Sequence, residues 1–475
     1  MLSLFPDERP DYSGDFAIGS DEPFAESKLL INGSLAQAFT EIRCGDRVFR
    51  GIDSVGCDLL TDKLMSDRLL QRIIKQSFYR AAGDFIEKRP VWGSLTGIRP
   101  AHIAAKLLES GASPFDAISK MESEYYVSPE RAAICVEAAQ ASLETKRALS
   151  PRDIALYVGI PFCPTRCTYC SFVSNSVENS FDMIAPFAEV LRREIEIAAN
   201  LVNEHGLRVT SVYFGGGTPT TLPETELESV LSTITDSFDL SAIAEFTFEA
   251  GRPDTITKEK LEIVTHYGAK RICVNPQSMS DTVLKAIGRI HSAQDVFRAA
   301  ELVRSSGAAL NMDIIAGLPN DSPESFENTI DTILGLKPEN ITVHTLSLKK
   351  GSKITLEGTV IPSGNDVGLM LDYASKKLRQ AGHRPYYLYR QKFTSGGFEN
   401  IGWSLPGYEG FYNICMMEEL CTVLALGGGG VTKLVSPHGR IDRVFNAKYP
   451  REYILFTEKL ENKYEKIRNF AANEF

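Results

Sequence analysis

The stretch GIPFCPTRCTYCSFVS, residues 159–174, contains three cysteines within eight residues: Cys163, Cys167 and Cys170. It overlaps the end of the apolar run IALYVGI (154–160), which predicts a buried β-strand. Thiols this close together at a strand end bind metals or form disulfides more often than they serve only as packing. Their number needs an explanation, because a structural metal site normally has four protein ligands.

Composition narrows the possible roles of these thiols. The chain has 475 residues, of which 51 are basic and 61 acidic, giving a net charge of −10. This balance argues against nucleic acid as the main partner. The start, MLSLFPDERPDYSGD, has no signal-peptide pattern, and no apolar run has transmembrane length. We therefore expect a cytoplasmic protein without membrane insertion, whose nine cysteines are reduced thiols.

Strand-like and helix-like segments alternate from residue 153 onward. The strand-like runs are IALYVGI (154–160), VTSVYFG (209–215), AEFTFEA (244–250), RICVNPQ (271–277), LNMDIIAGL (310–318) and ITVHTLS (341–347). This order predicts parallel strands joined by right-handed crossovers. A closed barrel needs eight such units, and the pattern contains six. We expect an α/β fold, an open three-quarter (β/α)6 barrel with ligands at the C-terminal strand ends.

Segments on both sides of this pattern suggest further domains. Short β-like runs lie at 28–33, 36–43 and 47–53, the last two separated by the hairpin signal 44–46, and helical periodicity follows from residue 62. Beyond 350 the alternation weakens into a helix (366–381), an aromatic run (384–391), a glycine cluster (424–431) and a last helix (450–462). The proposed division is an N-terminal arm (1–25), a small N-terminal α+β domain (26–148), the partial barrel (149–350) and a small C-terminal α+β domain (351–475).

The spacing of the three cysteines favours one metal site over others. A zinc site would have to add a distant ligand such as Cys273, since no second CxxC or HxxxH lies nearby. A disulfide with a spare thiol is disfavoured in a reducing compartment. An iron–sulfur cubane fits better, because three thiolates leave one of its irons open to a ligand that is not protein.

The pattern Cys163-x3-Cys167-x2-Cys170, with Tyr169 before the last cysteine, resembles the signature of radical S-adenosylmethionine enzymes. In that family the amino and carboxylate groups of S-adenosylmethionine chelate the open iron of a 4Fe-4S cluster. The second strand ends in GGGTPT (215–220), as in the oxygen-independent coproporphyrinogen III oxidase (dehydrogenase) group. Glycines there let the backbone approach a ligand closely, so Gly216, Gly217 and Thr218 are expected at the cofactor site.

Other residues match the same group one by one. The resemblance implies that they, together with Tyr169, hold S-adenosylmethionine, as one copy or as two. Carboxylates suit ribose hydroxyls and an ammonium group, and arginine pairs with a carboxylate. Each residue alone could equally form a buried salt bridge of the barrel. The matching positions are Tyr157, Glu249, Gln277, Arg289 and Asp313.

The chain departs from the well-known coproporphyrinogen enzymes in two places. They carry another cysteine two residues after the trio, where this chain has Ser171 and Phe172, a pattern typical of the related haem-chaperone branch. That branch has a His-Asn-x-x-Tyr-Trp segment, which corresponds here to YNICMM (412–417) and keeps only the asparagine. VWGSLTGIRPAHIAAKLL (91–108) resembles the additional N-terminal portion of one branch of the coproporphyrinogen dehydrogenase-like proteins.

Several further candidates carry weaker signals. His344 could line the pocket or be a satisfied barrel histidine. Cys415 and Cys421 could bind an auxiliary metal, although core packing fits their spacing better. The glycine run 427–430 resembles a family loop near the active site and by itself indicates a turn. Candidate contacts for propionate groups, which could also be solvated charges, are Arg384, Arg390 and Lys392 beside Tyr386, Tyr387 and Tyr389.

Taken together, the resemblance implies a radical enzyme of porphyrin biosynthesis. A reduced cluster would cleave S-adenosylmethionine to methionine and a 5′-deoxyadenosyl radical. The radical would then start the oxidative decarboxylation of two propionates of coproporphyrinogen III, giving protoporphyrinogen IX. An electron-donor protein such as flavodoxin or ferredoxin would reduce the cluster. The alternatives are a haem-binding chaperone with a cluster but no turnover, and a radical haem-modifying enzyme; no catalytic acid or base is assigned.

Overall fold

The computed structural model describes residues 24–86, 89–170, 175–349, 351–391, 393–455 and 458–474. The chain divides into two compact units, and the border between Val136 and Glu137 lies within helix α4 (Pro129–Ala148). The domain borders proposed at 148 and 350 stay predictions, and the proposed arm lies almost wholly outside the described residues. None of the described helices combines the length and apolar character needed to cross a bilayer.

The N-terminal unit contains a three-stranded antiparallel sheet and helices. Its strands are β1 (Phe24–Asn32), β2 (Leu35–Cys44) and β3 (Arg47–Gly56), in that order. Cys44 pairs with Arg47, so the hairpin predicted at 44–46 is confirmed. Alternate residues of β2, such as Ala36 and Ala38, are buried with Ile73 of helix α1 (Lys63–Gly83). The remaining helices are α2 (Ala101–Glu109), α3 (Pro114–Tyr125) and the start of α4.

The larger unit is organised around six adjacent parallel strands in chain order, which confirms the predicted (β/α)6 pattern. Nearly every residue of the first strand is buried, as expected of a parallel strand covered on both faces. The six strands are β4 (Asp153–Ile160), β7 (Arg208–Gly216), β8 (Glu245–Gly251), β9 (Arg271–Gln277), β10 (Ala309–Ala316) and β11 (Asn340–Thr345).

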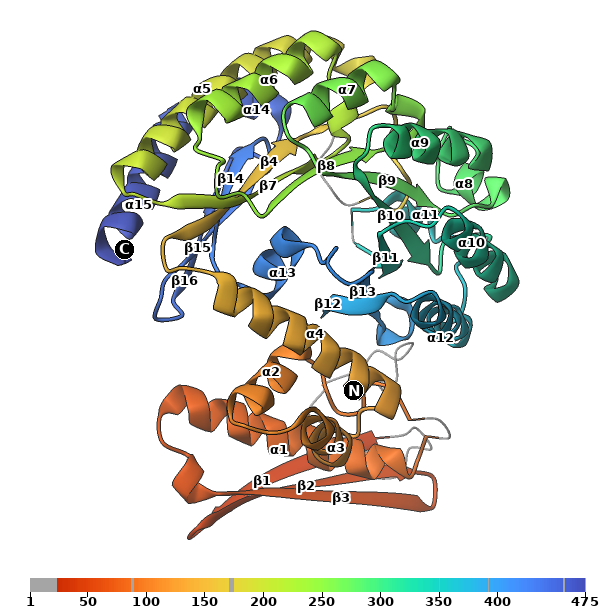
Figure 1. Cartoon of the computed structure of the whole chain (residues 1–475). Helices are drawn as coiled ribbons and strands as arrows, with labels where there is room; N and C mark the ends of the chain where they lie inside the picture. The colour runs from red at the N-terminus through yellow and green to blue at the C-terminus, as the bar shows by residue number, and fades with distance from the viewer. Residues whose placement is uncertain are drawn as a thin grey trace. The chain divides into compact units, whose positions relative to one another are not determined.

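Helices cover the convex face of this curved sheet (Figure 1). Their apolar residues recur at helical spacing and face the strands, and their starts carry local signals such as the capping box of Ser292 and Asp295. The helices are α5 (Ile184–Glu204), α6 (Glu224–Ser237), α7 (Lys258–His266), α8 (Asp281–Ala286), α9 (Ala293–Ser305), α10 (Pro323–Gly335) and α12 (Gly364–Gln380). The short α11 (Lys353–Glu357) instead contacts the loop that follows β4.

Strands from beyond residue 350 extend both edges of the same sheet. At one edge, β13 (Glu399–Ser404) pairs antiparallel with β11 and carries β12 (Arg384–Arg390) outside it. At the other edge, β14 (Thr422–Gly427) runs parallel to β4, followed by β15 (Val431–Val435) and β16 (Ile441–Phe445). Over the described residues, the resulting sheet has 11 strands and its two edge strands, β12 and β16, do not pair with each other. Helix α13 (Phe411–Glu418) lies on its concave side (Figure 1).

Two C-terminal helices, α14 (Pro450–Leu455) and α15 (Glu458–Glu474), pack against α5. The helix predicted over 450–462 therefore underestimates the helical content, which continues to Glu474. Fully buried Glu194 of α5 holds these segments together. Its carboxylate accepts from Lys463 Nζ at 2.7 Å, Tyr453 Oη at 2.5 Å, the Gly427 amide at 2.8 Å and Asn446 Nδ2 at 3.1 Å. We call these five residues the Glu194 network.

Candidate functional site

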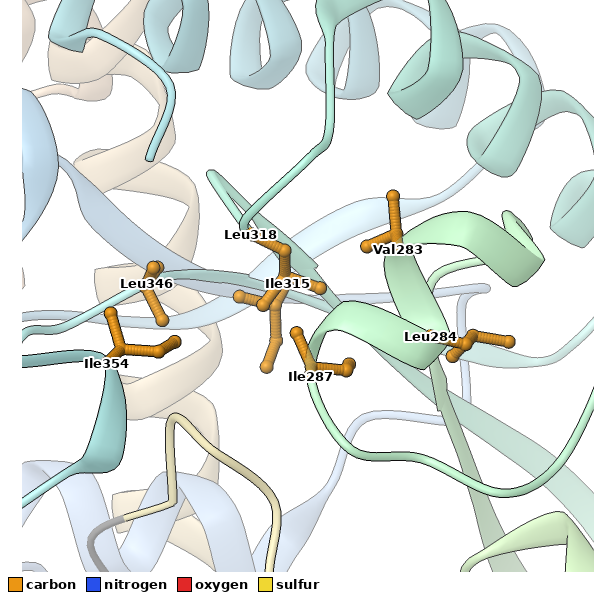
Figure 2. Close-up of a cluster of buried hydrophobic side chains, with 7 residues drawn as sticks. All are labelled: Val283, Leu284, Ile287, Ile315, Leu318, Leu346 and Ile354. Carbon is orange, nitrogen blue, oxygen red and sulfur yellow. The ribbon is translucent and has the colours of Figure 1, made fainter. Parts of the chain in front are cut away.

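The three cysteines lie on the loop that follows β4. Backbone hydrogen bonds fix this loop: the Thr168 amide donates to the Ile287 carbonyl at 3.0 Å, and the Ile354 amide donates to the Thr168 carbonyl at 3.2 Å. Tyr169 packs against an apolar cluster from α8, β10, α11 and the ends of neighbouring strands. Figure 2 shows this cluster: Val283, Leu284, Ile287, Ile315, Leu318, Leu346 and Ile354. The cluster therefore forms an apolar support behind the cysteine loop.

The glycine run after β7 lies directly against this loop. Gly216 has a φ of +106°, and a Cβ on Gly217 would come within 2.4 Å of the Phe162 carbonyl oxygen and 3.0 Å of Cys163 Sγ. Any side chain at Gly217 would thus push the cysteine loop away. The Thr218 hydroxyl donates to Cys163 Sγ at 3.5 Å. The sequence predicts that the backbone of this run approaches a ligand closely. The structure shows that it also approaches the cysteine loop closely.

A cavity of about 700 Å³ opens at the C-terminal ends of the parallel strands. All of the cofactor and cluster residues predicted from the sequence line it, although they come from five strands and their loops. Their roles as ligand contacts stay predictions, whereas their gathering in one place is an observation. They are Tyr157, Cys163, Cys167, Tyr169, Cys170, Gly216, Gly217, Thr218, Glu249, Gln277, Arg289 and Asp313.

Arg289 joins the cysteine loop to the end of β9. Its Nη2 donates to the Tyr169 hydroxyl at 3.1 Å, and its Nη1 donates to the Asn275 carbonyl at 3.3 Å. Burial raises the pKa of Tyr169, so the phenol stays protonated beside the guanidinium. Arg289 keeps its charge in this buried position, and its Nε has no hydrogen-bond partner. A buried guanidinium facing a cavity suits a ligand carboxylate.

Arg252, which the sequence analysis missed, holds the cysteine loop from the side of β8. Its Nη1 donates to the Thr165 hydroxyl at 2.7 Å, and its Nε lies 3.1 Å from Asp254 Oδ1. Burial tends to raise the pKa of Asp254, but His291 and Arg252 outweigh it and bring that pKa to about 2. Its place just after the strand AEFTFEA was the available signal, since parallel strands present their functional residues at this end.

The acidic side of the cavity is formed by β8 and β10. The Tyr213 hydroxyl donates to Glu249 Oε1, and Asp313 faces the same carboxyl group. Burial raises the pKa of Glu249 to about 7, with Asp313 adding to the effect while Tyr213 and His344 oppose it. Near neutral pH the Glu249 carboxyl can therefore take either form, and it can donate or accept a hydrogen bond.

His344 lies in the cavity wall and belongs to a chain of polar contacts. Its Nε2 is 3.7 Å from Asp313 Oδ2, and its Nδ1 is 3.5 Å from the Tyr389 hydroxyl. Asn311 Nδ2 donates to Asp313 Oδ1 at 3.0 Å, and Gln391 Nε2 donates to the Tyr389 hydroxyl at 3.4 Å. The sequence allows His344 either to line the pocket or to be a histidine with its polar contacts satisfied in the barrel. In the structure it does both.

Gln277 shows local strain at the cavity. Its φ is +68°, which non-glycine residues rarely adopt, and the β9–β10 register shifts beside it. Strained backbone and strand irregularities of this kind re-aim side chains at functional sites. Gln277 Oε1 and Asn275 Oδ1 are buried without a hydrogen-bond partner. Asn275, Gln277 and Arg289 all line the cavity, and their residue types suit the amino, carboxylate and hydroxyl groups of S-adenosylmethionine.

The cysteine loop also fits an iron–sulfur cluster. Cys167 is buried and Cys163 and Cys170 are half-buried, all as free thiols on the cavity wall. A cubane takes one thiolate per iron, so its ligands are spread over separate metal atoms. Among the described residues, no three His, Cys, Asp or Glu side chains gather as the ligands of a single metal ion. Cys273, which a zinc site would need, is buried in β9 and is not part of the cavity wall.

Some of the weaker candidates line the cavity, and others lie away from it. Tyr387 and Tyr389 line the cavity, whereas Tyr386 does not. Arg384 is exposed at the start of β12, and Arg390 Nη2 donates to the Gly397 carbonyl at 2.9 Å, so neither arginine faces the cavity. Lys392 lies outside the described residues. In the glycine run, Gly429 borders the cavity. Cys415 and Cys421 pack in an apolar cluster, as core packing predicts.

Helix α13 forms one wall of the cavity. In the sequence this stretch stands out only because it departs from the haem-chaperone motif. Tyr412, Asn413, Met416 and Met417 all border the cavity. The Tyr412 ring stacks on Tyr213 with centroids 4.4 Å apart, and Tyr157 lies 6.2 Å from Tyr412. Burial raises the pKa of these three tyrosines, so they remain neutral. The cavity thus combines a thiol and polar side with an aromatic side.

Comparisons with known proteins agree with this geometry. Residues 157–333 match the radical SAM superfamily. The oxygen-independent coproporphyrinogen-III oxidase-like protein HemZ of Bacillus subtilis is 38% identical over 369 residues, covering 76% of this chain and 74% of that protein. The heme chaperone HemW of Escherichia coli is 26% identical over 305 residues, covering 63% of this chain and 75% of that protein.

A solved structure supports the same fold. Coproporphyrinogen III oxidase (HemN) from Escherichia coli, described as a radical SAM enzyme, superposes with a TM-score of 0.53 at 21% identity. The superposition covers 67% of this chain and 72% of that one. At this level of identity the likeness bears on the fold, including the open arrangement of the parallel strands.

Proposed function

We propose that this chain, which belongs to the coproporphyrinogen III oxidase-like branch of the radical S-adenosylmethionine superfamily, carries out the oxygen-independent oxidative decarboxylation of coproporphyrinogen III to protoporphyrinogen IX. The cofactors of the superfamily are a 4Fe-4S cluster and S-adenosylmethionine, which supply a one-electron cleavage that starts radical chemistry. The observation that carries the proposal is the single cavity joining the cysteine loop to an aromatic wall.

The residues of the chain would divide the work between the two ends of the cavity. Cys163, Cys167 and Cys170 would hold three irons, and Arg289 would pair with the carboxylate of S-adenosylmethionine. Gln277 and Glu249 would bind its remaining polar groups, as one copy or two. For each propionate, a hydrogen atom, carbon dioxide and one electron leave, and a vinyl group remains. An electron acceptor must take that electron, and a flavodoxin- or ferredoxin-like protein would reduce the cluster.

The aromatic side suits the largely apolar ring system of a tetrapyrrole. Tyr387 and Tyr389 have nearly parallel rings with centroids 6.4 Å apart, and Tyr412 stacks on Tyr213. Aromatic walls with a few polar groups are typical of pockets for large organic ligands. Lys349 also lines the cavity and offers a cation for a propionate.

A second candidate is a haem-binding chaperone of the same fold. Helix α13 favours this candidate. Residues 412–417 correspond to the haem-chaperone motif, and four of them, Tyr412, Asn413, Met416 and Met417, form part of the cavity wall. The pattern CTYCSF (167–172), which is typical of the haem-chaperone branch, and the HemW relatives also favour a chaperone. A radical haem-modifying enzyme is a third possibility with the same cofactors.

Anaerobic product analysis separates these functions. Reconstituted protein is incubated with S-adenosylmethionine, a reductant and coproporphyrinogen III, and the tetrapyrroles are identified by mass beside the yield of 5′-deoxyadenosine. The proposal predicts loss of two carboxyl groups and cleavage stimulated by the substrate. Stoichiometric haem binding without any decarboxylated product would contradict it and favour the chaperone.

A further inference from the structure

The N-terminal unit contains a second cavity, of about 220 Å³, that the proposed function leaves unused. It lies between one face of α1 and the loop before α2, which includes the GSLTG part of the stretch 91–108 that the sequence analysis singled out. Every lining residue belongs to this unit: Arg68, Gln71, Arg72, Lys75, Gln76, Ser94, Leu95, Thr96, Gly97 and Tyr125.

Three cations of α1 converge on this cavity. Arg68, Arg72 and Lys75 are spaced four and three residues apart, which places them on one helix face. No acidic side chain lines the cavity, and within the described part of the chain none of the three forms an ion pair. Like charges at this spacing repel one another and destabilise a helix. An anion in the cavity would remove that repulsion.

Arg72 is the group best placed to meet such an anion. Its side chain is half-buried between the more exposed Arg68 and Lys75, and its Nε is buried with no hydrogen-bond partner. A guanidinium presents several N–H donors in one plane, which matches two oxygens of a phosphate or carboxylate. An oxyanion in the cavity would pair with the charge of this guanidinium, which has no other ionic partner among the described residues.

The loop opposite α1 is held by hydrogen bonds and leaves Thr96 and Gly97 facing the cavity. Gly93 has a φ of +53°, and the next residue, Ser94, donates its amide to the Tyr125 carbonyl at 2.8 Å and its hydroxyl to the same oxygen at 3.1 Å. Lys75 Nζ donates to the Thr96 hydroxyl at 3.4 Å. A Cβ at Gly97 would meet no atom within 4 Å, so its backbone is open to a ligand.

We propose that this cavity binds the phosphate group of a small phosphorylated molecule. Arg72 would contact two phosphate oxygens, Lys75 and Arg68 would balance the negative charge, and Thr96 and Gly97 would donate from the loop. Three cations match the double charge of a phosphate better than the single charge of a carboxylate. The net charge of −10 opposes an extended polyanion such as nucleic acid. The inference is independent of the radical site, which lies wholly in residues 137–475.

Isothermal titration calorimetry of the full chain tests this proposal. The probes are inorganic phosphate and inorganic pyrophosphate, compared with citrate and chloride at matched ionic strength. We expect saturable binding of the phosphate probes, weakened about tenfold or more by Arg72→Lys, which keeps a charge and loses the planar fork. Arg68→Gln combined with Lys75→Gln changes two exposed side chains and should weaken binding as much, even where Arg72 variants fold poorly.

Lys106→Gln is the matched control, since Lys106 is an exposed cation of the same unit outside the cavity. It should leave the affinity for the phosphate probes unchanged. The proposal is overturned if the unaltered chain shows no saturable binding of phosphate or pyrophosphate. It is also overturned if citrate binds in their place, or if Lys106→Gln weakens binding as much as the cavity variants do.

Discussion

Two buried polar regions of the larger unit differ in how their hydrogen-bonding groups are used. In the Glu194 network, both carboxylate oxygens accept hydrogen bonds and the ammonium of Lys463 lies 2.7 Å away, and only the Oδ1 of Asn446 is buried without a partner among the five residues. In the cavity wall, Asn275 Oδ1, Gln277 Oε1 and Arg289 Nε are buried without partners. An unpartnered buried polar group costs about 1–3 kcal/mol, so three of them in one wall need an explanation. The paired charges make the network structural, and the polar residues of the cavity wall suit a polar ligand.

The two central carboxyl groups make the same contrast. Glu194 faces a cation and two tyrosines, whereas Glu249 faces one tyrosine and a second carboxyl group, Asp313. The same type of side chain can therefore have a structural role opposite a cation and a ligand-binding role opposite another carboxyl group. Changes in the network should alter folding, and changes in the cavity wall should alter ligand use while the fold persists.

The largest expected effect on stability is that of Glu194→Ala. The change leaves the Lys463 ammonium buried without its partner, which should lower the free energy of unfolding by about 3–5 kcal/mol. Glu189→Ala on the same helix removes exposed ion pairs with Arg192 and Arg193 and should cost no more than about 1 kcal/mol. Urea denaturation of both variants measures the difference. Equal losses would show that the network has no special structural role.

Removing Arg289 should act on ligand use. Arg289→Ala leaves a ligand carboxylate unpaired, a loss of roughly 2–5 kcal/mol of binding where the pair is buried. We expect iron content close to that of the unaltered chain and a much lower yield of 5′-deoxyadenosine. Arg298→Ala, which removes an exposed pair with Asp295, serves as the control. Poor folding of Arg289→Ala with a normal yield per folded chain would make Arg289 structural.

Glu249 should give the cofactor-free protein a characteristic pH dependence. Its pKa is raised from 4.5 to about 7 in the folded chain, so its contribution to stability is full below pH 4.5 and is lost as the pH rises through about 7. The loss is at most about 3 kcal/mol. Glu249→Gln cannot ionise, so its unfolding free energy should fall less over this range. Parallel pH profiles for the two proteins would contradict the raised pKa.

Local sequence signals were enough for the parallel strands and for the gathering of cluster and cofactor positions. Apolar runs mark the strands, and residues at their C-terminal ends meet at one edge by geometry. The partnership of Glu194 with Lys463 leaves no such signal, because 269 residues separate them and neither lies in a motif. The same holds for β14, whose place beside β4 is set by long-range packing.

Cationic side chains were the least predictable group. Arg390, set among tyrosines, resembled a substrate contact, but its guanidinium is used by the Gly397 carbonyl. Arg252 drew no attention, yet it fixes the cysteine loop through Thr165. Arg68, Arg72 and Lys75 drew no attention either, and their shared cavity depends on a loop that lies about 20 residues further along the chain. The sequence shows the position of each charged residue along the chain, but its partners depend on tertiary contacts.

The most direct test of the account is the iron and labile sulfide content of Cys167→Ala and Cys273→Ala after anaerobic reconstitution. We expect about four irons and four sulfides per chain for the unaltered protein and for Cys273→Ala, and loss of the cluster in Cys167→Ala. Both altered cysteines are buried, so the pair controls for the loss of a buried thiol. Equal loss in both variants, or zinc bound tightly in place of iron, would contradict the assignment of the cysteine loop.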